Sequence, residues 1–452
     1  MTDETGSRGA EVPRRRPRQG DRARGSPRAA DAASGRSRAP RIGLALAGGG
    51  PLGAVYEIGA LRALDEALGG IRLAALDKYV GVSAGAFLAA CLANGITPTE
   101  LVRMLFRDEP GEIPFNTGVF FEPAVGEWVR RGLRMPRLVA ESLWGFVAHP
   151  REQTLGMAVA HLSRALPVGI FANEPIRRYV HQLFGRPGRT DDFRRLRRRG
   201  RELVVVAADL GAGRAVRFGD SGWDDVPISR AVQASTAVPG LYTPVRIKGR
   251  HHVDGAVLKT VHASVLLEDG VDLLLVLNPL VPIDTTADRR GRTAEEPDLV
   301  EEGLPTVLSQ TVRGMLHSRM RASLSRYRYR APGTDVVLFE PGRDEYGVFF
   351  APLFSFRARE AICALAYEAT LRDLRRRRAT LAPRLARHGA YLRDEVLAHT
   401  AADLWRGVGL RATRDGTLVA RRLERALAQA EAVSERRGPR RRPSAAPSVE
   451  AG

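Results

Sequence analysis

Five consecutive residues form the strongest chemical pattern of the sequence. Gly81-Val82-Ser83-Ala84-Gly85 is a G-x-S-x-G pentapeptide that follows a short apolar run and precedes a stretch of small residues. At a turn from a strand into a helix, such a serine is held in a strained backbone conformation with its hydroxyl beside the helix N-terminus. The sequence therefore predicts Ser83 as a nucleophile, with Gly81 and Gly85 letting the turn close.

A run of glycines lies one predicted strand earlier, in Gly48-Gly49-Gly50-Pro51-Leu52-Gly53. Closely spaced glycines leave backbone N–H groups open to a ligand, either a phosphate or the oxyanion of acyl transfer. No Lys-Ser or Lys-Thr pair follows the last glycine and no acidic residue ends a second strand, which disfavours nucleotide binding. We expect an oxyanion hole framed by Gly48, Gly49, Gly50 and Gly53.

The third motif is Asp254-Gly255-Ala256, which follows His251-His252-Val253. An isolated Asp-Gly pair is normally only a turn. It gains meaning here because it occurs in the same chain as a candidate nucleophile and a candidate oxyanion hole.

Strands and helices must position these motifs. Short apolar runs predict five buried strands, over residues 42–46, 78–82, 203–207, 271–277 and 336–339. Helical patterns separate them, which indicates an α/β fold with a largely parallel sheet. Residues of about 100–200 predict a helical insertion with several aromatic side chains, interpreted as a lid, a lipid-contacting surface or simple packing. Helices with Arg-rich faces are expected after residue 354.

The three motifs, in this order, resemble those of the patatin-like phospholipase family over roughly Gly43 to Pro279. Further similar blocks are 207–216 and 234–240. The resemblance implies a three-layer α/β/α fold and a Ser–Asp dyad that works without histidine, metal or cofactor. Ser83 would be the nucleophile and Asp254, with Gly255 and Ala256 in its motif, would accept the serine proton. The implied reaction is hydrolysis of a lipid acyl ester through an acyl-enzyme.

Two positions depart from the family pattern. Leu52 stands where the family usually has Arg or Lys, and Lys259-Thr260-Val261-His262 stands where an Asn-Pro pair is often found. Both departures affect the expected subtype and substrate more than the expected catalysis.

Composition places the chain in a broad class. The 452 residues carry a net charge of +19, which favours contact with an anionic membrane surface, and no specific nucleic-acid partner is predicted. The two cysteines, Cys91 and Cys363, cannot form a disulfide framework or a metal cluster. Without a signal peptide or an apolar stretch of about 18 residues, we expect a cytoplasmic, membrane-peripheral protein. The oligomeric state stays open.

Four regions are expected along the chain. Residues 1–40 and 434–452 are basic and poor in large apolar residues, which predicts disordered tails. Residues 41–280 are expected to form the catalytic domain and residues 281–433 a strand and helical accessory region.

Two other functions stay open at this point. A Ser-His-Asp triad is one alternative, with His317, His388 or His399 as the base. The other is a catalytically idle membrane-binding scaffold.

Overall fold

The computed structural model describes residues 39–107, 121–148, 163–282, 300–301, 303–342 and 356–410. The two predicted basic tails lie outside the described residues, apart from Ala39 and Pro40.

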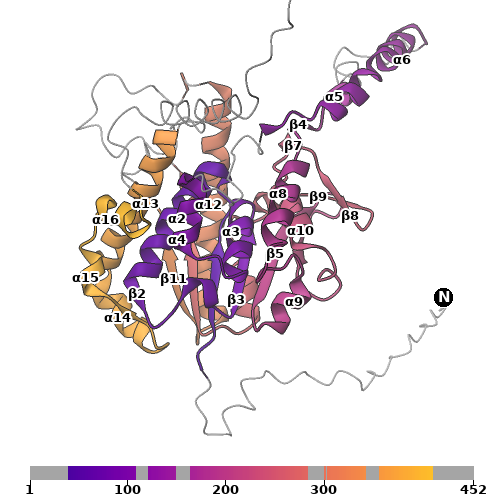
Figure 1. Ribbon diagram of the computed structural model, residues 1–452. Coiled ribbons are helices and arrows are strands. Elements are labelled where there is room, and N and C mark those ends of the chain that lie inside the picture. Colours follow the sequence, from indigo (N-terminus) through magenta and orange to yellow (C-terminus); the bar gives the residue numbers. More distant parts are fainter. Residues whose placement is uncertain are drawn as a thin grey trace, which may run out of the picture. The chain divides into compact units, whose positions relative to one another are not determined.

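One eight-stranded sheet organises the chain from Pro40 onward (Figure 1). Its strand order is β11-β10-β1-β3-β5-β9-β8, and β6 also pairs with β5. The parallel strands are β1 (Ile42–Leu46), β3 (Lys78–Val82), β5 (Glu202–Asp209), β10 (Leu273–Leu277) and β11 (Asp335–Phe339). The antiparallel strands are β6 (Arg214–Phe218), β8 (Val245–Ile247) and β9 (Arg250–Asp254). All five predicted strands are confirmed. The resembling block 207–216 contains the turn from β5 into β6, whereas β8 and β9 were not foreseen.

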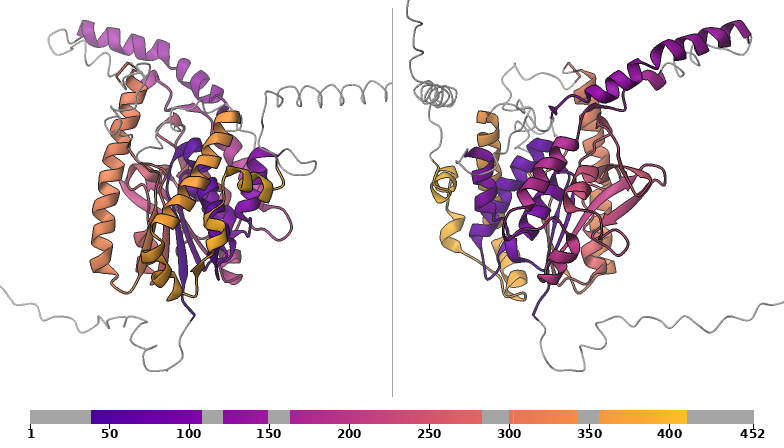
Figure 2. Two further views of the ribbon diagram at one scale, coloured as in Figure 1. Left: turned by 90° about the vertical axis from the view of Figure 1, so that its left-hand side faces the viewer. Right: turned by 45° about the vertical axis from the view of Figure 1, so that its right-hand side comes forward.

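Helices cover both faces of this sheet (Figure 2). On one face lie α2 (Gly50–Ala67), α3 (Ala84–Ala93), α4 (Pro98–Phe106), α8 (Glu174–Phe184), α9 (Phe193–Arg198), α10 (Ile228–Ser235) and α13 (Phe356–Arg376). On the other face lie α11 (Ser264–Glu268) and α12 (Leu304–Arg330). The fold is therefore the expected three-layer α/β/α arrangement with a largely parallel central sheet, a helical insertion and C-terminal helices.

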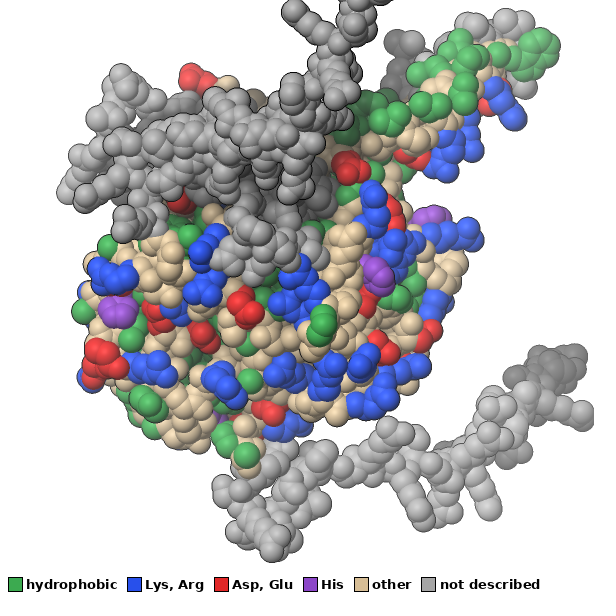
Figure 3. Space-filling model, in the orientation of Figure 1, with side chains coloured by type: hydrophobic (Ala, Val, Ile, Leu, Met, Phe, Trp, Pro, Cys, Tyr) green, Lys and Arg blue, Asp and Glu red, His purple; other side chains and the backbone are tan. Residues whose placement is uncertain are grey.

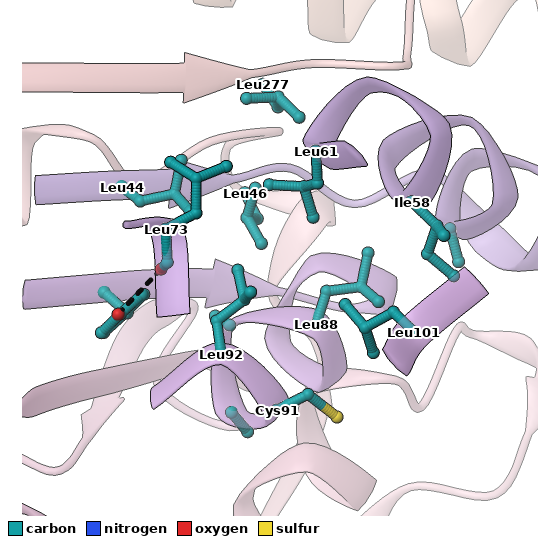
Figure 4. Packing of buried hydrophobic residues seen from close by; sticks show 14 of the residues in the cluster. Leu44, Leu46, Ile58, Leu61, Leu73, Leu88, Cys91, Leu92, Leu101 and Leu277 are labelled. Atoms are coloured by element: carbon teal, nitrogen blue, oxygen red, sulfur yellow. Dashed lines mark hydrogen bonds between the residues drawn. The ribbon is translucent and has the colours of Figure 1, made fainter. Parts of the chain in front are cut away.

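The sheet divides the hydrophobic core into two clusters because successive strand side chains point to opposite faces. In β1, Leu44 and Leu46 pack toward α2 and α3, whereas Ala45 packs with residues of α11 and α12. Figure 4 shows the first cluster, where Leu44 and Leu46 lie near Leu61 of α2 and Leu88 of α3. Both faces of the strands are buried, which explains their continuous apolar sequences.

Helix α2 is buried on nearly all sides because α13 packs against its outer surface. A Cβ at Gly59 would lie 2.2 Å from the carbonyl oxygen of Cys363, so the glycine permits the close crossing. On α13, Ile362 and Ala366 are buried at this contact.

The remaining elements are two small sheets, two helices of the insertion and three C-terminal helices that pack beside α13. Two small sheets pair β2 (Leu68–Gly69) with β12 (Tyr391–Leu392) and β4 (Gly169–Phe171) with β7 (Gly240–Tyr242). The other helices are α5 (Val125–Gly132), α6 (Met135–Ala148), α14 (Arg378–Ala386), α15 (Asp394–Leu397) and α16 (Ala401–Gly407). Within the described residues, no helix has both the length and the apolar character needed to cross a bilayer.

Candidate active site

Ser83 occupies the turn between β3 and α3. Its backbone has φ 54° and ψ −125°, a left-handed conformation that an L-residue with a side chain rarely adopts. The conformation is held by neighbours, since the Ser83 N–H donates to the hydroxyl of Ser235 at 2.8 Å. Ser235 in turn donates to the carbonyl of Val206 at 2.6 Å, which ties the turn to β5.

Gly81 and Gly85 flank this turn where no side chain fits. A Cβ at Gly81 would lie 2.4 Å from the carbonyl oxygen of Gly85, and one at Gly85 would lie 2.4 Å from that of Ala47. The Gly85 N–H also donates to the Ala47 carbonyl at 3.1 Å. The two glycines therefore let α3 begin directly against the end of β1.

Strand β5 brings Asp254 beside Ser83. Val82 of β3 is paired with Val206, and Asp254 of β9 is paired with the next residue, Ala207. The nucleophile candidate and the aspartate therefore follow each other along the same edge of β5. The two residues are 171 positions apart in the sequence, and strand pairing brings them together.

The two side chains form a buried pair. The Ser83 hydroxyl donates a hydrogen bond to the Asp254 carboxyl, and both residues are buried. Burial raises the pKa of Asp254 to about 6, against the opposing effects of the Ser83 hydroxyl and the Ala256 N–H. That N–H donates to Asp254 Oδ1 at 2.8 Å and fixes the carboxyl group in the turn. A raised pKa makes this carboxylate a stronger base than an exposed aspartate.

The glycine run lies directly beside the pair. A Cβ at Gly48 would lie 3.2 Å from the Cβ of Ser83 and 3.0 Å from that of Ala256. The predicted oxyanion-hole residues differ in what their N–H groups do. The Gly48 N–H donates to the Thr260 carbonyl at 3.2 Å, and the Gly53 N–H donates to the Gly49 carbonyl at 3.1 Å.

The remaining donors come from two helix N-termini. Gly50 and Ala84 are the first residues of α2 and α3, and a first helical residue has no acceptor within its own helix. In these two described helices, the first turn carries no acidic side chain that would neutralise the partial positive charge. Both termini meet at the carboxyl edge of β1 and β3, which suits a developing oxyanion. Ala84 was not predicted as a donor from the sequence motifs.

We expect Gly48→Ala to lower kcat by about tenfold to a hundredfold, with little change in KM, because the new methyl group displaces Ser83 by tenths of an ångström. Steady-state hydrolysis of a soluble ester measures this effect. Gly314→Ala in α12 is the matched control, since its Cβ meets nothing within 4 Å. Equal activity of the two variants would mean that the Gly48 position tolerates a side chain and does not shape the site.

Two buried polar residues support the site without having been foreseen. Ser235 belongs to one of the resembling blocks, yet nothing in the sequence indicated its bond to the Ser83 N–H. Glu57 of α2 is fully buried, and its Oε1 accepts from the N–H of Ala47 at 3.0 Å. Burial raises the pKa of Glu57 well above its usual range. Its only signal in the sequence is an acid within an otherwise apolar stretch.

The histidines of the alternative triad have carboxylate neighbours of their own. His317 Nε2 lies 3.5 Å from Glu340, His388 Nε2 lies 2.7 Å from Asp335, and His399 Nδ1 lies 3.7 Å from Glu66. Asp335 begins β11, which is separated from β3 by the two strands β10 and β1, and it lies at the opposite end of the parallel strands. The structure therefore brings together Ser83, Asp254 and the glycine run, and it places each of these three histidines beside a carboxylate other than Asp254.

Comparison with known proteins agrees with this geometry. Residues 44–267 match the model of the family described as patatin-like phospholipase. Among solved structures, VipD from Legionella pneumophila is 14% identical, with a TM-score of 0.36 over 75% of this chain and 67% of VipD. The type III effector ExoU is 15% identical, with a TM-score of 0.32 over 75% of this chain and 54% of ExoU. These two likenesses are too distant to add to the family match. The chain thus carries a patatin-like phospholipase domain over residues 44–267.

Proposed function

We propose that the protein hydrolyses acyl esters of phospholipids or acylglycerols through a Ser83–Asp254 dyad, in lipid catabolism or remodelling. The hydrogen bond from the Ser83 hydroxyl to the buried Asp254 carboxyl is the observation that carries this proposal. No cofactor or metal ion takes part in the proposed chemistry.

In the first half-reaction, Ser83 Oγ attacks the ester carbonyl carbon while Asp254 accepts its proton. The carbonyl oxygen becomes an oxyanion, which backbone N–H groups at the starts of α2 and α3 stabilise. Collapse of this intermediate expels the alcohol, which takes the proton back from Asp254 and leaves an acyl group on Ser83. Water, deprotonated by Asp254, then releases the fatty acid and restores the serine.

Turnover of a short-chain chromogenic ester by the full chain tests this proposal. A fluorophosphonate probe supplies a second readout, because it reacts covalently with an activated serine, and peptide mass spectrometry locates the adduct. We expect turnover and an adduct on Ser83. An idle scaffold would give neither, and an adduct on another serine would move the nucleophile.

We expect kcat/KM to fall by about tenfold per pH unit below about pH 6, because Asp254 must be ionised to accept the proton and its pKa is about 6. At pH 5 only about one tenth of the molecules would carry the charged base, and at pH 8 nearly all would. A pH–rate profile of a soluble ester measures this dependence. An exposed aspartate would hold its rate down to about pH 4, so a flat profile from pH 7 to pH 4.5 would contradict the assignment of Asp254 as a buried base.

We further infer that the protein acts peripherally on an anionic membrane surface. The net charge of +19 and the lipid substrate class support this inference. We expect the basic tails to strengthen this membrane binding. Both tails lie outside the described residues, apart from Ala39 and Pro40.

A further inference from the structure

Large apolar side chains are exposed together on α5 and on the small β4/β7 sheet. Leu133 is 78% exposed, Trp128 and Leu241 are each 45% exposed, and Ile170 is 44% exposed. We name these residues the docking surface, together with two further exposed residues of α5: Val125 and Val129. Exposed apolar side chains gathered in this way mark contact sites rather than ordinary surface.

On α5 the apolar residues form one stripe. Val125, Trp128, Val129 and Leu133 are spaced by three, one and four residues, which places them on one side of a helix. Figure 3 shows hydrophobic side chains along the α5 and α6 segment with Lys or Arg side chains beside them. An amphipathic helix of this kind, with tryptophan on one side and arginine on the other, is typical of segments that lie in a bilayer interface.

Four arginines accompany the stripe and give the segment its charge. The basic residues are Arg130, Arg131, Arg134 and Arg137. Glu127, which is buried, accepts from the guanidinium groups of Arg130 and Arg131. Burial acts to raise the pKa of Glu127, but hydrogen bonds from Arg131 and Arg130 outweigh it and hold this pKa below its usual range. Arg137 is also paired with Glu141 at 2.7 Å. With four arginines against these two glutamates, the segment keeps an excess of positive charge, which complements anionic headgroups.

The β4/β7 sheet extends the same surface. Gly169 pairs with Gly240 and Phe171 with Tyr242, so Ile170 and Leu241 are neighbours on one face. Phe171 and Tyr242 lie on the opposite face with ring centroids 6.2 Å apart.

Backbone bonds join α5 to this small sheet. The Ala124 N–H donates to the Ile170 carbonyl at 3.0 Å, and the Ala172 N–H donates to the Glu122 carbonyl at 2.8 Å. The start of α5 is therefore held against β4, which places the two exposed apolar groups on adjoining elements.

The docking surface is connected to the dyad by one short segment. Ser235, which holds the Ser83 N–H, ends α10, and β7 begins at Gly240. Between them, the Ala237 carbonyl accepts from the Asp254 N–H at 2.9 Å. An apolar contact made at Leu241 therefore lies only a few residues from groups that hold both members of the dyad.

We propose that the docking surface inserts into the interfacial region of an anionic phospholipid bilayer and presents the membrane to the dyad. This proposal rests on the lipid substrate class of the proposed function. Trp128 and Leu133 enter the acyl boundary, and the arginines of the α5 and α6 segment contact lipid phosphates. A second copy of the chain is the alternative occupant, and it is an outcome of the test below.

The test is co-sedimentation of the full chain with phosphatidylcholine vesicles containing about one third phosphatidylglycerol, at low salt. We expect Trp128→Ser to weaken vesicle binding by about tenfold. The double variant, Trp128→Ser with Leu133→Ser, should bind still more weakly, because each change removes an apolar side chain that the bilayer would bury. Tyr391→Ser is the matched control: Tyr391 is an exposed aromatic in β12, which pairs with β2 at the far end of α2. Its binding should equal that of the wild type.

Several results would overturn this assignment. The wild type failing to bind at low salt is one, and the double variant binding as tightly as the control is another. A change of oligomeric state in the double variant, seen by light scattering, would instead make the surface a contact between copies of the chain. Co-sedimentation needs no turnover, and soluble-ester hydrolysis by the wild type is measured separately, so failure of the docking surface and failure of the proposed enzyme activity remain distinguishable.

Discussion

Ser83→Ala should reduce ester hydrolysis by about four to six orders of magnitude, because it removes the atom that forms the acyl-enzyme. The substitution keeps a Cβ, so the left-handed backbone at this turn is no more strained than before. The lost hydrogen bond to Asp254 costs about 1 kcal/mol, which lowers Tm by about 2–4 °C. Turnover of a soluble ester and thermal unfolding measure the two effects separately.

Ser229→Ala is a close control for this experiment. Ser229 is also fully buried and also donates its hydroxyl to an aspartate, Asp191, at 2.7 Å. Its loss should affect stability in a similar way and leave ester turnover near the wild-type value. If the Ser83 variant kept normal activity after contaminating esterases were excluded, the nucleophile would have to be another residue.

The sequence predicted the parallel part of the sheet well. The apolar runs of β1 and β3 end near the glycine run and at the Ser83 turn, and both predicted ranges match the structure to the residue. Such strands are buried on both faces, so composition alone marks them. Helix α3 ends at a residue pair typical of helix C-termini, with Asn94 as the cap and Gly95 following in a left-handed conformation.

The antiparallel part could not be predicted in the same way. Strand β9 contains Arg250, His251 and His252, whose polar character resembles that of a loop. What makes it a strand is its pairing with β5 and β8, and pairing of this kind depends on distant residues. For the same reason, no residue pattern indicated that Asp254 lies beside Ser83, and only the family resemblance suggested it.

Buried polar partners are the other feature that the sequence concealed. Ser235 and Glu57 both bond to backbone N–H groups of the site, those of Ser83 and Ala47. A backbone partner leaves no complementary residue type in the sequence, so no pair of side chains indicates the contact. Their roles follow only from the folded positions.

Asp254→Asn should be nearly as damaging as Ser83→Ala, whereas loss of a distant histidine should not be. In a triad, histidine accepts the serine proton and aspartate only orients the ring. In a dyad the carboxylate takes the proton itself, and it can do so only in concert with attack and with the oxyanion stabilised. The amide of asparagine retains an oxygen for the Ala256 N–H, so the turn is kept while the base is lost.

Asp209→Asn is the matched control for this change. Asp209 lies on β5 beside β9, and its Oδ1 accepts from the N–H groups of Gly211 and Ala212 at 3.0 Å each. Asp209 therefore supports a turn, as Asp254 does. The Ser83 hydroxyl, however, donates to Asp254 and not to Asp209. The control should retain most of the wild-type turnover.

The histidine variants complete the comparison between dyad and triad. His317→Ala, His388→Ala and His399→Ala should each keep most of the activity, since these rings lie against Glu340, Asp335 and Glu66. The nearer histidines, His251, His252 and His262, should also be dispensable as bases. His262 is the one most able to disturb the site, because its ring bonds to the backbone of Gly255.

Circular dichroism establishes that each variant is folded before turnover is compared. A folded variant of His317, His388 or His399 without activity, together with an active Asp254→Asn, would replace the dyad by a triad.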